Sequence, residues 1–95
     1  MDAGFDWNPE KNRRLAEQRG ISFERVISVI ERGGLVDVLE HPDQGRHPGQ
    51  MIYVVDIERY LSLVPFVTAA DGTGFLKTII PSRKATRDYQ RRRSP

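Results

Sequence analysis

The sequence has no cysteine among its 95 residues. A disulfide framework and a thiolate metal site are therefore excluded as the basis of its fold. Long apolar runs are also missing: the longest, around Leu61 to Ala70, is interrupted by Pro65 and is far shorter than the roughly 20 residues of a membrane-spanning helix. The residues from Met1 to Asp6 are acidic and lack the apolar core of a signal peptide. These absences predict a soluble protein of the cytoplasm that does not enter a membrane.

Several common catalytic and cofactor-binding patterns are absent too. The chain contains no phosphate-binding P-loop, no dinucleotide-binding glycine motif and no HExxH zinc motif. His41 and His47 share a loop with Asp43, but their spacing matches no structural metal site. We therefore predict that the protein uses neither a metal nor a cofactor.

The composition indicates one small folded domain with an uneven charge. Hydrophobic residues make up 38% and charged residues 29% of the chain, which is typical of a globular domain. We predict that the domain spans residues 1–90 and that residues 91–95 form a basic tail, most simply a solvated one. Residues 51–95 carry eight Lys and Arg against four Asp and Glu, whereas residues 1–50 carry seven against nine. A cationic half of this kind suits nucleic acid, because each phosphate contact releases condensed counterions.

Two helices are predicted near the N-terminus. Asn8 can cap the first, which Pro9 suits as a first-turn residue, and Gly20 can end it after about Gln18. Ser22 can cap the second helix, which ends at about Gly33 and Gly34. Apolar residues at helical spacing predict its buried face: Phe23, Val26, Ile27 and Ile30. The aromatic residues ahead of the first helix, Phe5 and Trp7, are predicted to contact the core or a partner, with base stacking as the alternative.

Four strands are predicted to follow as an antiparallel meander, at residues 35–39, 51–57, 60–68 and 75–80. Glu58 and Arg59 join the central pair without the glycine or asparagine that such turns favour. Pro65 indicates an edge or bulge position in its strand. A short helix capped by Ser82, from Arg83 to about Gln90, completes an α+β fold of two N-terminal helices, a four-stranded antiparallel sheet and a C-terminal helix.

The junction between the last strand and the last helix is the strongest candidate site. Arg83 and Lys84 lie beside the backbone N–H groups of a predicted helix start, a combination that suits phosphate. The alternative is that both are ordinary surface charges, or that Arg83 pairs with a carboxylate of the first helix. Further cations complete the predicted RNA-binding set: Lys77, Arg87, Arg14 and Arg19.

Three segments, in order along the chain, resemble those of BrnT-type toxins. They are Phe5-Asp6-Trp7-Asn8-Pro9-Glu10-Lys11-Asn12, Arg19-Gly20-Ile21-Ser22-Phe23-Glu24 and Ile79-Ile80-Pro81-Ser82-Arg83-Lys84-Ala85-Thr86. The chain departs from the family at Arg19, where the family usually has histidine. The resemblance implies a RelE-like ribonuclease of a bacterial type II toxin–antitoxin system, neutralised by a ribbon-helix-helix antitoxin. It also implies a toxin–antitoxin hetero-oligomer. A homodimer of the free chain is the alternative, formed through the first helix or an exposed sheet edge.

Metal-independent RNA cleavage requires a base for the 2′-OH proton, an acid for the leaving 5′-oxygen and cations for the charged phosphorane. Arg83 is the first candidate for the cation, because its guanidinium can hold two phosphate oxygens at once; Lys11 and Lys84 are candidates for the same role. Proton transfer is left open among several residues: Glu10, His41, His47, Tyr89 or a lysine. The alternative function is a non-catalytic or degenerate toxin that binds protein or nucleic acid in operon autoregulation.

Overall fold

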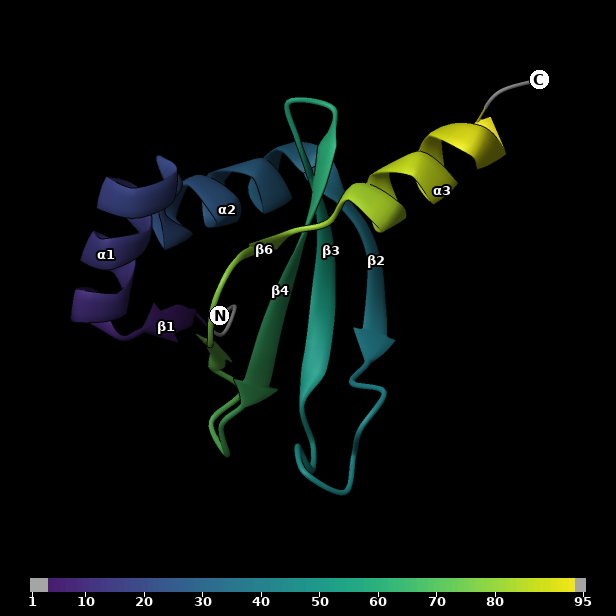
Figure 1. Ribbon diagram of the computed structural model, residues 1–95. Helices are drawn as coiled ribbons and strands as arrows, with labels where there is room; N and C mark the ends of the chain where they lie inside the picture. The colour runs from purple at the N-terminus through teal and green to yellow at the C-terminus, as the bar shows by residue number, and fades with distance from the viewer. Residues whose placement is uncertain (1–3, 94–95) are drawn as a thin grey trace.

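Helices lie on both sides of a twisted sheet in the computed structural model, which describes residues 4–93 (Figure 1). Residues 1–3 of the acidic start and residues 94–95 of the predicted tail lie outside the described part. The elements run β1 (Phe5–Trp7), α1 (Pro9–Arg19), α2 (Phe23–Val29), η1 (Ile30–Gly34), β2 (Leu35–Glu40), β3 (Met51–Ile57), β4 (Tyr60–Thr68), β5 (Gly74–Leu76), β6 (Ile80–Pro81) and α3 (Arg83–Arg93). The predicted α+β class is confirmed, although the sheet differs from the predicted meander.

The helix boundaries follow from local capping, as predicted. The Asn8 side chain accepts hydrogen bonds from the N–H groups of Glu10 and Lys11, and Gly20 ends α1 in the left-handed conformation at φ 69°. Ser22 caps α2 by accepting from the N–H of Arg25. α2 then widens into the π-type turn η1, which ends because Gly33 adopts a φ of 95°. A positive φ of this kind favours glycine.

The sheet is mixed rather than purely antiparallel. Its strand order is β1-β5-β4-β3-β2, with β6 also paired to β4. The correction comes from β1, a strand that the sequence analysis did not predict, which runs parallel to β5 and pairs Asp6 with Phe75. β1 is only three residues long, and its partner lies almost seventy residues further along the chain, so its pairing leaves no local signal in the sequence.

The predicted fourth strand, 75–80, is divided into β5 and β6. Phe66 pairs with Leu76 and Leu63 pairs with Ile80, so four steps along one chain match three along the other. This extra residue bulges out next to Pro65, which has no N–H to donate. Pro65 therefore sits opposite a bulge, although β4 is not an edge strand.

The main core lies between the sheet and the first two helices. Its buried residues come from both layers: Leu15, Phe23, Val26, Val55, Val64, Phe66, Leu76 and Ile79. Leu76 and Ile79 lie three positions apart and would face opposite sides of an unbroken strand, but the bulge lets both enter this core. Phe5 and Trp7 pack against it, and the Trp7 and Phe23 rings lie 5.9 Å apart. Among residues 4–93, no helix combines the length and apolar character needed to cross a membrane.

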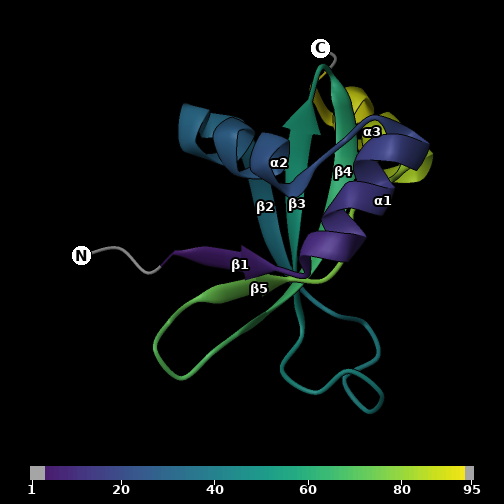
Figure 2. The same ribbon diagram turned by 90° about the vertical axis from the view of Figure 1, so that its left-hand side faces the viewer.

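α3 lies on the other side of the sheet from α2 (Figure 2). It continues to Arg93, three residues past its predicted end. A helix that starts at β6 and crosses the sheet carries its side chains away from the main core. Its position determines where the basic C-terminal residues are displayed.

Candidate nucleic-acid interface

The start of α3 is fastened to the sheet by hydrogen bonds from both ends of its first turn. The Ser82 N–H donates to the carbonyl of Leu61 at 2.9 Å, and the Ser82 hydroxyl accepts from the N–H of Ala85 at 3.1 Å. Thr86 Oγ1 accepts from the buried N–H of Leu61 at 2.8 Å and donates to the carbonyl of Ser82 at 2.7 Å. The first turn of α3 therefore has a fixed position relative to β4.

The cations on this anchored turn point into solvent. Arg83, Lys84 and Arg87 are all exposed. Within residues 4–93 the ion pairs join carboxylates to Arg13, Arg25 and Arg46 only, so Arg83 does not pair with the first helix. The amides of a first helical turn have no intrahelical acceptor and carry partial positive charge. Guanidinium, ammonium and amide donors are therefore gathered within the first turns of α3.

Two other predicted cations lie along the segment that leads into α3. Arg19, at the end of α1, donates from Nη1 to the carbonyl of Ile79 at 3.1 Å. Lys77 donates its backbone N–H to the carbonyl of Pro65, and its ammonium lies 5.4 Å from the centre of the Phe75 ring. Arg19 therefore contacts the segment between Lys77 and Arg83, which leads directly into α3.

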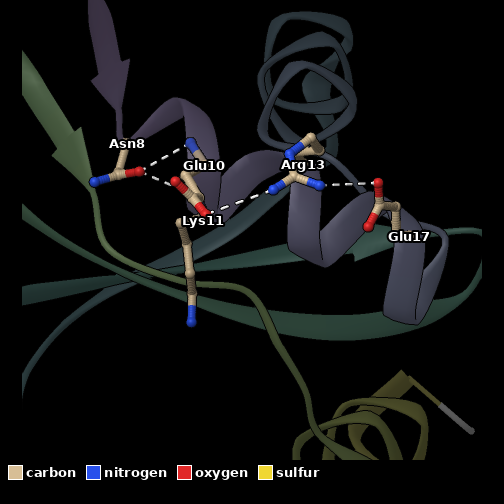
Figure 3. A network of polar contacts seen from close by, with 5 residues as sticks. All are labelled: Asn8, Glu10, Lys11, Arg13 and Glu17. Atoms are coloured by element: carbon tan, nitrogen blue, oxygen red, sulfur yellow. Dashed lines mark hydrogen bonds and ion pairs between the residues drawn. The ribbon is translucent and has the colours of Figure 1, made fainter.

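The candidates on α1 have different surroundings. Arg13 bridges Glu10 at 3.5 Å and Glu17 at 3.2 Å on an exposed face of the helix (Figure 3). The side chain of Lys11 points away from this row and is half-buried. Arg14 is exposed on the same helix. Glu10 is therefore already paired with Arg13. The Lys11 ammonium, by contrast, forms no ion pair with a carboxylate of residues 4–93.

Asn12, which the sequence analysis did not single out, joins the first two helices. Its Oδ1 accepts from the N–H of Phe23 at 2.7 Å, and its Nδ2 donates to the carboxylate of Glu24 at 2.7 Å. This bond from Asn12 is the largest cause of the lowered pKa of Glu24. The available signal was the spacing of Asn12 and Leu15, which places both on one face of α1.

His47 lies in the loop between β2 and β3, at the end of the sheet away from α3 (Figures 1 and 2). Its ring lies against that of His41, with centroids 4.2 Å apart and the planes tilted by 36°, and His41 Nδ1 accepts from the N–H of Asp43. Within residues 4–93 no three His, Asp or Glu side chains gather as a metal ion would require. The four predicted catalytic residues, Glu10, Lys11, His47 and Arg83, thus occupy three separate elements.

An apolar groove of about 300 Å³ lies between α3 and the sheet. Its floor contains Val54, Leu61 and Leu63, and Tyr89 lines its α3 side. Lys84, Asp88 and Arg92 also line it from α3, and Asp37 lines it from β2. No pattern in the sequence indicates the groove, because it depends on where α3 crosses the strands.

Two further groups have shifted pKa values for local reasons. The backbone N–H of Thr73 lowers the pKa of Asp71, to which it donates at 2.9 Å in the turn before β5. Burial raises the pKa of Tyr53, whose ring stacks on Phe66. Neither group lies on α3, so neither pKa shift concerns the candidate interface.

Comparison with models of protein families, with curated proteins and with solved structures gave no match to this chain.

Proposed function

We propose that the protein is an RNA-cleaving toxin that binds its substrate over the start of α3. The observation that carries the proposal is a set of exposed cations at an anchored helix start, Arg83, Lys84 and Arg87, that form no ion pair within residues 4–93. Arg83 and Lys84 lie between Ser82 and Thr86, whose hydrogen bonds to Leu61 hold this turn on the sheet. Arg87, which follows Thr86, is exposed as well. Phosphate contacts of this type supply most of the affinity of proteins for RNA backbones.

The chemistry that fits a metal-independent site is transesterification. The 2′-oxygen attacks the adjacent phosphorus, the bond to the 5′-oxygen breaks, and the products are a cyclic phosphate and a 5′-hydroxyl. Arg83 is assigned to the phosphorane charge, because its planar guanidinium can contact two phosphate oxygens. Lys84 and the free ammonium of Lys11 are assigned a supporting electrostatic role. His47 lies outside this surface and Glu10 is held by Arg13, so neither is assigned the proton transfer.

The partner follows from the resemblance of three segments to BrnT-type toxins. We propose a cognate ribbon-helix-helix antitoxin as the protein that neutralises the chain. Co-expression of such a partner should restore growth to cells that express the chain alone and should yield a complex that purifies as a unit. Toxicity that persists in cells containing a stable complex would contradict neutralisation by binding.

A second candidate function is a non-catalytic module that binds RNA or a partner protein. It is favoured by one observation: His47 lies in the loop at the other end of the sheet from α3 (Figures 1 and 2), and Glu10 is already paired with Arg13. Such a module would bind RNA in a salt-dependent manner and leave it intact.

Incubation of the purified chain with RNA separates the two functions. Wild-type protein should cleave and Arg83→Ala should not, with Arg46→Ala as the matched control, since Arg46 is an exposed arginine in the distant β2–β3 loop. Circular dichroism should show all three folded. Binding without cleavage by the wild type would select the non-catalytic module, and full cleavage by Arg83→Ala would remove Arg83 from the proposed site.

A further inference from the structure

The edge of the sheet at β2 is open and apolar. β2 ends the strand order, so one side of its backbone has no neighbouring strand within residues 4–93. Of the five large hydrophobic side chains exposed in that range, three belong to this single strand: Leu35, Val38 and Leu39. Edge strands are usually protected by charged side chains, proline or a covering element. β2 contains no lysine or proline, and its charged residues are the two carboxylates Asp37 and Glu40.

The backbone N–H and C=O groups of Val38 lie in the plane of the sheet and point away from β3. The N–H of His41 donates to the carbonyl of Gln50 at 3.0 Å, on the β3 side. Because this direction alternates along an antiparallel strand, Leu39 also faces β3 while Val38 and Glu40 face outward. The N–H of Val38 accordingly donates to Oδ1 of its neighbour Asp37 at 2.8 Å. Within residues 4–93, this local contact is the hydrogen bond made by the Val38 N–H at the centre of the open edge.

We propose that β2 pairs antiparallel with β2 of a second copy, about a two-fold axis at Val38. The axis fits Val38 because its outward N–H and C=O can bond the same groups of the other copy. An axis at Asp37 would set two carboxylates opposite each other and use backbone groups already directed at β3. With the axis at Val38, Asp37 lies opposite Leu39 of the second copy, and the two Val38 side chains meet on the other face.

This pairing would have a consequence for the cationic surface. A two-fold axis normal to the sheet keeps each face on the same side in both copies. α3 crosses the sheet near the Leu35 end of β2 (Figure 1), so the two α3 helices lie on one face at opposite ends of the paired strands. The cations of both copies thereby border one longer surface, which suits an extended polyanion. The pairing itself does not depend on RNA cleavage.

The absence of native cysteine makes a cross-linking test direct, since a single new cysteine can form a disulfide only with another copy. In the proposed register the two Val38 Cα atoms lie about 5.5 Å apart, within the range that a disulfide spans. Val38→Cys should therefore cross-link rapidly under mild oxidation. Leu39→Cys and Tyr60→Cys, at similarly exposed positions, should cross-link slowly. Equal rates for all three variants would overturn the register.

Sedimentation equilibrium tests the dimer without cysteine. The wild type should approach about 22 kDa, twice the 10.9 kDa of one chain, and Val38→Lys should halve this mass. Tyr60→Lys, which is equally exposed but off the edge, should remain dimeric. A monomeric wild type at every concentration would overturn the proposal, as would a dimeric Val38→Lys. Mass gained only on adding a different protein would assign the edge to that protein instead.

Discussion

The hydrogen bond from the buried N–H of Leu61 to Thr86 Oγ1 should stabilise the folded protein and hold α3 in its position on the sheet. Thr86→Val keeps the shape of the side chain but removes the acceptor. Leu61 is 3% exposed, so its N–H would be left buried and unpaired, which costs about 1–3 kcal/mol. The Ser82 carbonyl would still accept from the backbone N–H of Thr86 at 3.0 Å, so the loss of the hydroxyl donor adds little.

Urea denaturation measures this effect. A cost in that range lowers the midpoint by on the order of 1 M for a protein of this size. Thr86→Ser is the matched control, because it keeps the hydroxyl and loses only a methyl group, so it should retain most of the stability. If Thr86→Val were as stable as the wild type while Thr86→Ser were weakened, methyl packing rather than the hydrogen bond would hold α3.

Four other predictions address separate features. Arg59→Gly should raise stability by about 0.5–1 kcal/mol in urea, because Arg59 holds a φ of 69°; unchanged stability would show that the turn is unstrained. Asn12→Ala should cost about 1–3 kcal/mol and speed hydrogen exchange at Phe23, and slow exchange there would contradict the helix clamp. The pKa of Glu24 is lowered below 4.5, so its stabilisation is present above that value and lost as pH falls through the lower folded pKa. Stability measured across this window should therefore fall less for Glu24→Gln than for the wild type. Lys84→Ala should reduce the salt dependence of RNA binding by about 0.7 in log–log slope, and an unchanged slope would exclude a phosphate contact.

The helices were predictable because their signals are local. Asn8, Ser22 and Ser82 each cap the helix that follows within three residues, and Gly20 ends α1 where its φ must be positive. The sheet was only partly predictable. Its central hairpin forms between the two predicted strands, with Ile57 paired to Tyr60, even though Glu58 and Arg59 both adopt positive φ. The register itself could not be predicted, because this turn lacks the glycine or asparagine that such turns favour.

At the candidate site, the position of the cations could be predicted from the sequence, whereas the hydrogen bonds that hold the helix start could not. Arg83 and Lys84 follow Ser82 directly, so their position at a helix start could be inferred from neighbouring residues. The bond from Leu61 to Thr86 joins residues 25 positions apart, and no pattern within either segment specifies it. The position of β2 at the edge of the sheet likewise could not be predicted from the sequence, because whether a strand is central or terminal depends on pairings made elsewhere in the chain.

The polar residues of the α3 start therefore divide into two groups with different tasks. Ser82 and Thr86 bond to β4, whereas Arg83 and Lys84 have no carboxylate partner among residues 4–93. If the division is correct, the two groups fail differently when changed. Thr86→Val should lower stability and RNA affinity together, while Arg83→Ala should lower RNA affinity at unchanged stability. Urea midpoints and RNA titrations on the same samples make the comparison. A large loss of stability in Arg83→Ala would mean that the guanidinium supports the fold, and the assignment of Arg83 to substrate phosphate would have to be abandoned.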